Sequence, residues 1–182
     1  MKVKIYGRLA FANLHQPNTK FEKPRFDVSV IVDPDSKSAA DLAAAVEKVA
    51  SEKWKDKAPG VLKQLRKQDR VCYREEPKLN KEGDVYPGFE GMHFVDANNP
   101  ARPTLLDTDK TPLVESDGKP YSGCYAWVIV DLWAQDSPQW GQRINASLLG
   151  VQFAKDGDSF GGAAPASADD FDELDAGDND LA

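Results

Sequence analysis

The sequence predicts a mainly β fold with helices, of the α+β class. Segments rich in β-branched and aromatic residues recur between Gly, Pro, Asn and Asp turn signals, which is typical of strands. One long segment, residues 36–56, instead repeats apolar residues at helical spacing. A chain of 182 residues has enough material for one core, so we expect one domain with a tail.

The first strand is expected at residues 2–14, where apolar and polar residues alternate. The predicted core face consists of Val3, Ile5, Gly7, Leu9 and Phe11, and the opposite face of Lys2, Lys4, Tyr6, Arg8 and Ala10. Cations beside an aromatic residue occur on ordinary solvated faces. They also occur in grooves that follow a phosphate backbone, and the strand by itself leaves both interpretations open.

A second strand is expected at residues 24–33, directly before the long helix. Asp35 or Ser36 would cap that helix. The apolar stripe that would face the sheet comprises Leu42, Val46, Val49 and Trp54. Ala58-Pro59-Gly60 is predicted to end the helix, and residues 61–68 to form a short second one.

The remaining strands are expected at residues 70–75, 91–97 and 123–134, with 143–154 as an added strand or the closing segment. The strand at 123–134 is the one around which the others would assemble. Its core face would consist of Cys124, Ala126, Val128, Val130, Leu132 and Ala134, and its other face of Tyr125, Trp127, Ile129, Asp131 and Trp133. Either a helix or the tail covers these rings, or they form a stacking platform for unpaired bases.

Charge is distributed unevenly along the chain. The formal net charge of −7 argues at first sight against a nucleic-acid partner. However, the last basic residue is Lys155, and nine of the 30 acidic residues follow it. Residues 1–155 therefore hold 23 basic and 21 acidic residues, a net charge of about +2. This asymmetry indicates a weakly basic body with an acidic tail.

We predict a folded domain at residues 1–160 and a flexible acidic tail at residues 161–182. The tail begins with small residues, and too few of its residues are large and apolar for it to fold alone. It would either keep the protein soluble or act as a docking peptide for partner proteins. The residues that would anchor such a peptide are Phe171, Leu174 and Leu181.

The residues also argue against several function classes. No apolar run is long enough to span a membrane and the N-terminus does not resemble a signal peptide, so we expect a cytoplasmic protein. Cys72 and Cys124 are expected as free thiols. His15 and His93 do not have metal-ligand spacing, and the sequence has no phosphate loop or nucleophile elbow. We therefore expect no metal, no cofactor and no catalytic activity.

Two parts of the sequence carry a more specific signal. One is the run from Phe94 to Pro103, Phe-Val-Asp-Ala-Asn-Asn-Pro-Ala-Arg-Pro. The other comprises Tyr121 to Tyr125, Gly141 to Arg143, Leu148 to Phe153 and Lys155 to Gly157. Together they resemble, in the same order, a family of phage single-stranded DNA-binding proteins over about half of the chain.

The resemblance implies a five-stranded Greek-key barrel of the OB type. It also implies that the protein coats and protects single-stranded DNA during phage replication and recombination, in the cytoplasm of the host cell. The acidic tail would then recruit replication proteins such as a polymerase, helicase or primase.

The leading hypothesis is therefore a sequence-tolerant single-stranded DNA-binding protein. The predicted stacking residues are Tyr6, Phe94, Tyr125, Trp127 and Trp133. The predicted phosphate contacts are Lys2, Lys4, Arg8, Arg74, Arg102 and Arg143. One alternative is an acidic interaction protein or DNA mimic that binds a replication enzyme without contacting DNA. Another is an accessory nuclease in which Asp107 and Asp109 would hold Mg²⁺.

Overall fold

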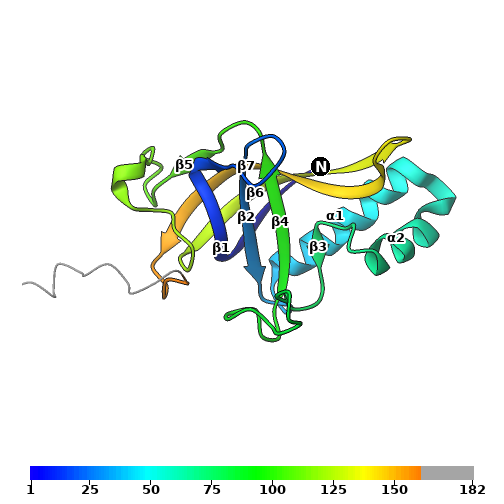
Figure 1. Cartoon of the computed structure of the whole chain (residues 1–182), viewed down its shortest axis with the longest axis horizontal. Coiled ribbons are helices and arrows are strands. Elements are labelled where there is room, and N and C mark those ends of the chain that lie inside the picture. Colours follow the sequence, from blue (N-terminus) through cyan, green and yellow to red (C-terminus); the bar gives the residue numbers. More distant parts are fainter. Residues whose placement is uncertain (161–182) are drawn as a thin grey trace, which may run out of the picture.

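The computed structural model describes residues 1–160, in which strands wrap into a barrel and two helices lie together on one side of it (Figure 1). The strands are β1 (Lys2–Asn18), β2 (Arg25–Val32), β3 (Tyr73–Arg74), β4 (His93–Asn99), β5 (Thr104–Leu106), β6 (Tyr125–Ser137) and β7 (Gly141–Lys155). The helices are α1 (Lys37–Trp54) and α2 (Ala58–Lys67), with 3-10 turns η1 (Lys55–Lys57) and η2 (Glu115–Asp117). The predicted tail, residues 161–182 with Phe171, Leu174 and Leu181, lies outside the described residues.

Five of the strands close into a barrel in the order β1-β2-β4-β7-β6. Neighbouring strands are antiparallel except β4 and β7, which meet in parallel where Asn98 lies opposite Ser147. Asn99 Nδ2 strengthens this short contact by donating a hydrogen bond to Leu148 O at 3.0 Å. A closed five-stranded barrel with one long helix confirms the OB-type fold that the resemblance implied.

Residues 70–74 complete the seam between β4 and β7, because their backbone runs between the two strands. Cys72 N donates to Ile144 O at 2.9 Å, and Ile144 N donates to Arg70 O at 3.0 Å. On the other side, Asp96 N donates to Cys72 O at 3.0 Å. The segment therefore joins β4 to β7 beyond their direct contact.

The two faces of β6 are as predicted. The inward residues Ala126, Val128, Val130 and Leu132 are fully buried in the core, while Ala134 is half-buried. On the outward face, Trp127 is 39% exposed and Trp133 is 44% exposed. The interpretation in which a helix covers these two rings is therefore wrong.

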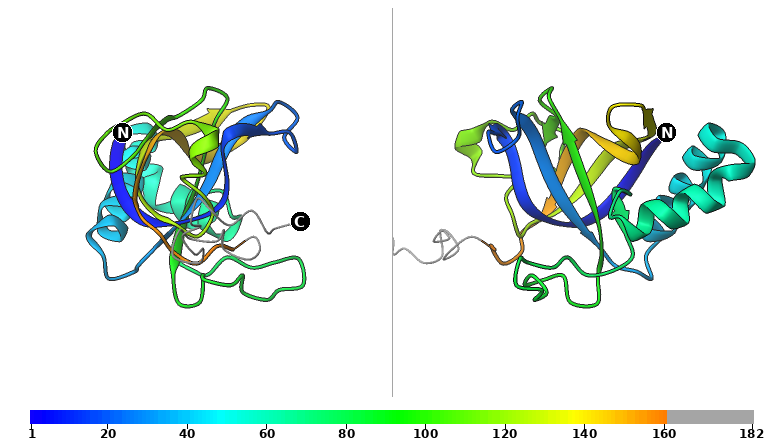
Figure 2. Two further views of the ribbon diagram at one scale, coloured as in Figure 1. Left: turned by 90° about the vertical axis from the view of Figure 1, so that its left-hand side faces the viewer. Right: turned by 45° about the vertical axis from the view of Figure 1, so that its right-hand side comes forward.

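Helix α1 packs against the barrel through the predicted stripe, since Leu42, Val46, Val49 and Trp54 are all buried. Ser36 caps it, and Ser36 Oγ accepts a hydrogen bond from Ala39 N at 3.2 Å. Both helices lie beside the hairpin of β6 and β7 (Figure 2). No helix in residues 1–160 has the length and apolar character that crossing a membrane requires.

The prediction for the second helix was wrong at its start. Ala58-Pro59-Gly60 does not end a helix but forms the first turn of α2, which begins at Ala58 instead of residue 61. Proline is tolerated there because the first turn of a helix has no backbone acceptor for its missing N–H. The break between the helices lies at η1, where Lys55 has a positive φ of 51°.

The predicted orientation of the side chains on β1 is wrong at Phe11. Phe11 was expected in the core but is 45% exposed, whereas Ala10 lies on the predicted outer face and is buried there by a second apolar cluster. Phe11 has a φ of 50°, and the pairing of β1 with β2 shifts register between Ala10 and Asn13. A bulge at this point reverses the alternation of side chains, which a strict period of two cannot foresee.

A second apolar cluster lies outside the barrel core. It comprises Ala10, Ile31, Phe89 and Phe94, with Tyr86, Met92 and Phe160 packed against it. Ile31 and Phe94 alternate with core residues of β2 and β4, so they point away from the core. The loop before β4 supplies Phe89 and covers this part of the outer surface.

We expect Gly7→Ala to lower the free energy of unfolding by about 1–3 kcal/mol, because β2 leaves no space for a side chain. A Cβ at this position would lie 2.2 Å from Ile31 O and 2.7 Å from Val30 Cγ1. Urea denaturation would measure the change. Gly60→Ala is the matched control, because a Cβ there has nothing within 4 Å and alanine favours a helix. Equal midpoints for the two variants would contradict the prediction.

Candidate nucleic-acid interface

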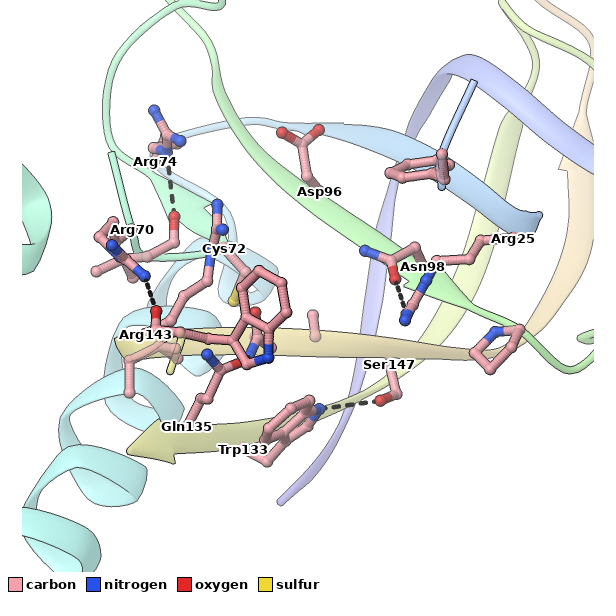
Figure 3. Close-up of a pocket in the computed structure, with 17 residues that line it drawn as sticks. Arg25, Arg70, Cys72, Arg74, Asp96, Asn98, Trp133, Gln135, Arg143 and Ser147 are labelled. Atoms are coloured by element: carbon pink, nitrogen blue, oxygen red, sulfur yellow. Dashed lines mark hydrogen bonds between the residues drawn. The ribbon is translucent and has the colours of Figure 1, made fainter. Parts of the chain in front are cut away.

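An open groove with a volume of about 620 Å³ crosses the outer surface of the barrel (Figure 3). Its floor consists of side chains from β6, β7, the segment 70–74, β4 and the first residue of β2. In the segment 70–74, Arg70, Cys72 and Arg74 line the groove together with the buried Val71, while Tyr73 is buried away from it. The polar and charged residues that line the groove are Arg25, Arg70, Arg74, Asp96, Asn98, Gln135, Arg143, Asn145 and Ser147.

Three partly exposed aromatic rings stand along this groove. Trp133 belongs to β6, Phe21 to the loop between β1 and β2, and Trp140 to the turn between β6 and β7. Phe21 is 39% exposed and Trp140 is 62% exposed. Trp133 Nε1 donates a hydrogen bond to Ser147 Oγ at 3.0 Å, which fixes the plane of its ring. Exposed rings fixed in this way offer π faces to a ligand.

The groove is strongly cationic. Four arginines line it, and Asp96 supplies the only carboxylate that lines it among residues 1–160. Lys78 Nζ lies 2.8 Å from Asp96 Oδ1, so this negative charge is compensated. Burial raises the pKa of the Cys72 thiol to about 12, which keeps it neutral at pH 7. The excess of positive charge therefore remains available to an anionic ligand.

The four arginines differ in how firmly they are held. Arg25 Nη1 donates to Asn98 Oδ1 at 2.9 Å, and Arg70 donates to the carbonyl oxygen of Trp140. Arg74 donates to Val71 O at 3.0 Å and also pairs with a carboxylate outside the groove. Arg143 is exposed, and its side chain has no hydrogen-bond or ion-pair partner among residues 1–160. Arg143 thus has all its donors free for a ligand.

A second surface combines rings and cations, and we call it the β1–β6 wall. It comprises Lys2, Lys4, Tyr6, Tyr125, Trp127 and Lys155. Tyr6 lies opposite Trp127 in the ladder, with their ring centroids 5.1 Å apart, and also stacks on Tyr125 at 6.2 Å. Lys4 Nζ lies 4.7 Å from the Trp127 ring, and Lys155 Nζ lies 4.7 Å from the Tyr125 ring. Cations over ring faces are attracted by the ring quadrupole.

Arg8 lies at the edge of this wall, and its donors are occupied within the protein. Arg8 Nε donates to Gly123 O at 3.0 Å and Arg8 Nη2 donates to Asp158 O at 2.6 Å. Its guanidinium carbon also lies 4.0 Å from the centroid of the Phe160 ring. Arg8 therefore holds the last described residues, 156–160, against the barrel.

Comparisons with known proteins identify the family of this chain. The family model described as "Enterobacter phage Enc34, ssDNA-binding protein" matches residues 1–182. The chain belongs to this family. A relative, the putative protein p50 of Acyrthosiphon pisum secondary endosymbiont phage 1, is 33% identical over 180 residues, covering 96% of this chain and 94% of p50.

Solved structures of phage single-stranded DNA-binding proteins share the fold. The Enc34 protein in complex with single-stranded DNA has a TM-score of 0.63 at 21% identity, covering 88% of this chain and 89% of that protein. The single-stranded DNA-binding protein gp2.5 of bacteriophage T7 has a TM-score of 0.56 at 10% identity, covering 97% of each chain. At these identities the likeness concerns the fold.

The structure divides the predicted site residues of this family member into two groups. Trp133, Arg74 and Arg143 come together in the groove. Lys2, Lys4, Tyr6, Tyr125 and Trp127 form the wall instead, with Arg8 at its edge. Arg102 is exposed two residues beyond Pro100, which lines the groove.

Phe94 does not offer a free ring face. It is 4% exposed, and its ring packs edge-on against Phe89 at a centroid distance of 5.7 Å. Lys78 Nζ lies 4.9 Å from its centroid and covers it further. The ring is covered because the loop before β4 folds over the outer surface at this point. Phe94 therefore has no open ring face on which a base could stack.

Among the four arginines and three aromatic residues that line the groove, sequence reasoning missed four, namely Phe21, Arg25, Arg70 and Trp140. Trp140 could have been found, because a tryptophan in a Pro/Gln/Gly turn is an unusual choice for a solvated loop. Arg25 and Phe21 lie at or near the predicted start of the second strand but carry no pattern of their own. Arg70 reaches the groove only through the long-range pairing of residues 70–74 with Ile144.

Trp54 holds the β6–β7 hairpin against α1, and this contact should respond to acid. Trp54 Nε1 donates to Asp136 Oδ2 at 2.8 Å; this bond and a second from Gln142 lower the pKa of Asp136 below its ordinary 3.8. The bond is stronger to the ionised carboxylate, so it keeps its full strength above pH 3.8 and weakens as the pH falls through the lowered pKa.

We expect the indole N–H resonance of Trp54 to stay constant from pH 7 to about 4 and to move at lower pH. A two-dimensional NMR titration would measure this. Trp133 is the control, because its acceptor is the hydroxyl of Ser147, which does not titrate. A Trp54 midpoint above 3.8, or parallel shifts of both resonances, would contradict the prediction.

Proposed function

We propose that the groove binds single-stranded DNA and that the protein coats and protects such DNA in phage replication and recombination. The observation that carries this proposal is the meeting of four arginines and three partly exposed aromatic rings in one open groove. Barrels of the OB type bind oligonucleotides on a face that two loops flank. Here these are the loop between β1 and β2, which contains Phe21, and the turn between β6 and β7, which contains Trp140. The structure of the related Enc34 protein in complex with single-stranded DNA supports the same ligand.

The aromatic rings and the guanidinium groups would make different contacts with the DNA. Bases would stack on Trp133, Trp140 and Phe21, because every base has a π face. Arg143 would neutralise phosphates directly, and its free donors allow a bidentate contact. The held arginines would supply a fixed positive potential along the groove.

The amides of the groove support binding that tolerates any sequence. Asn145 Nδ2 donates to Gln135 Oε1 at 3.2 Å, and Asn98 accepts from Arg25. These bonds occupy part of the hydrogen-bonding capacity of the amides, which leaves fewer groups to read base edges. Stacking and charge remain as the main contacts, and neither distinguishes one base strongly from another.

The acidic tail would serve as a docking peptide for replication proteins, such as a polymerase, helicase or primase, in the host cytoplasm. Its sequence supports this role, because acidic residues surround the apolar residues Phe171, Leu174 and Leu181. The alternative of a DNA mimic would need a carboxylate-rich binding surface on the body. The groove has the opposite charge, so we prefer DNA as its ligand.

We expect two groove substitutions to weaken binding in different ways. Trp133→Ala should weaken binding to oligo(dT) about 5- to 150-fold at all salt concentrations, since one stacking contact is lost. Arg143→Ala should reduce the slope of log K against log salt by about 0.7, since one phosphate contact is lost. Titrations followed by tryptophan fluorescence or anisotropy would measure both effects.

Lys48→Ala is the matched control for these titrations, because Lys48 is an exposed cation on α1 outside the groove. It should leave both the affinity and the salt slope unchanged. If all three variants bind as the unmodified protein does, the groove is not the binding site.

Deleting residues 165–182 should tighten DNA binding, because tethered negative charge competes with DNA for the cationic groove. Seven acidic residues are removed by this deletion. The gain should be largest at low salt and shrink at 0.15 M, where screening reaches only about 8 Å. A full-length variant with these acids replaced by Asn and Gln would separate charge from length. Equal affinities would rule out competition but leave the docking role standing.

A further inference from the structure

The outward face of β6 connects the groove to the β1–β6 wall. Trp133 lines the groove, and Trp127 lies on the same face of the same strand because six residues separate them. That spacing corresponds to about 20 Å along a strand. Ile129 lies between them and is 40% exposed, so the face stays open along this distance.

The wall carries positive charge that no ion pair within residues 1–160 neutralises. The ion pairs of residues 1–160 include neither Lys4 nor Lys155, although both ammonium groups lie over aromatic rings. Asp131 is the one acidic residue on the outward face of β6, and it forms an ion pair with the N-terminal amino group at 2.7 Å. The path between groove and wall therefore presents no uncompensated negative charge.

We propose that single-stranded DNA leaves the groove beside Trp133 and continues along β6 to the wall. There a base stacks on Trp127, whose ring is supported from the side by Tyr6, while Lys2, Lys4 and Lys155 neutralise phosphates. This inference rests on the proposed function of the groove. It assigns a two-part binding site, in which the wall is engaged only by strands longer than the groove.

The combination of chemical groups favours an unpaired nucleic-acid strand over other occupants. A second protein could cover Trp127 and Ile129, but a purely apolar contact would leave the lysines without counterions. In single-stranded DNA every nucleotide carries both a base, which can stack on Trp127, and a phosphate, which a neighbouring lysine can neutralise. A DNA strand bound in the groove would already lie along β6, because the outward face of β6 reaches the groove at Trp133. The acidic residues 161–182 are the competing occupant, and the test distinguishes them.

The indole N–H resonances of the full-length protein provide the test, because each tryptophan reports on one place. Trp133 and Trp140 report on the groove, Trp127 on the wall, and buried Trp54 serves as the internal control. Tryptophan-to-phenylalanine variants would assign the four signals. Oligo(dT) of increasing length would then be added at fixed salt.

We expect short oligonucleotides to shift the resonances of Trp133 and Trp140, and longer ones to shift Trp127 as well. A Trp127 signal that never moves while the groove signals do would overturn the wall but not the groove. A Trp127 signal that moves with the shortest strand would overturn the continuous path. If no groove signal moves, the proposed function itself fails. A Trp127 signal that responds to salt without DNA and not to any oligonucleotide would identify the acidic residues 161–182 as the occupant, and would overturn the inference.

Affinities give an independent readout. Trp127→Thr retains a residue that favours strands, and it should weaken binding of a long oligonucleotide about 5- to 150-fold while leaving a short one unaffected. Lys4→Ala should lower the salt slope by about 0.7 for the long strand only. Lys48→Ala is again the control for charge. Equal losses for short and long strands would contradict the two-part site.

Discussion

The closure of the barrel at its β4–β7 seam determines where the groove lies and what lines it. The two strands meet directly at a single pair, Asn98 and Ser147, and residues 70–74 supply the remaining backbone hydrogen bonds. An extended backbone places alternate side chains on opposite faces. The same hydrogen bonds that complete the core with Val71 and Tyr73 therefore direct Arg70 and Arg74 outward. The closure of the barrel and two of the four arginines of the groove depend on one segment.

The distribution of charge explains how an acidic protein can present a DNA-binding surface. The whole chain carries −7, and residues 1–155 carry only about +2. Four arginines face one groove, where the single carboxylate is paired with Lys78. What matters to a polyanion is this local arrangement and not the mean charge of the chain.

Period-two patterns allowed the sequence to predict the faces of β6 and most of β1, because a strand alternates wherever its pairing is regular. The prediction failed at Phe11, where a bulge shifts the register. The capping of α1 was also predictable, since Ser36 acts through its immediate neighbours. The resemblance supplied the barrel, which periodicity alone does not specify.

The candidate site was harder to predict than the fold. Trp133, Arg74 and Arg143 do meet, but their meeting depends on pairings between residues far apart in sequence. For the same reason Arg70 was missed, and Phe94 was assigned to a surface that Phe89 in fact covers. Which side chains share a face of one strand is local information, and which strands become neighbours is not.

The contacts of Arg8 with Gly123, Asp158 and Phe160 also fix the point from which the chain continues beyond residue 160. The backbones of Gly123 and Gly157 pack closely, since a Cβ on Gly157 would lie 2.3 Å from Gly123 O. This packing holds residues 156–158 in place. Any 22 residues span at most roughly 75 Å. All acidic residues after Phe160 therefore lie within roughly 75 Å of this point along the chain. Their effective concentration near either cationic surface is set by this anchoring point, and not by the amount of protein in solution.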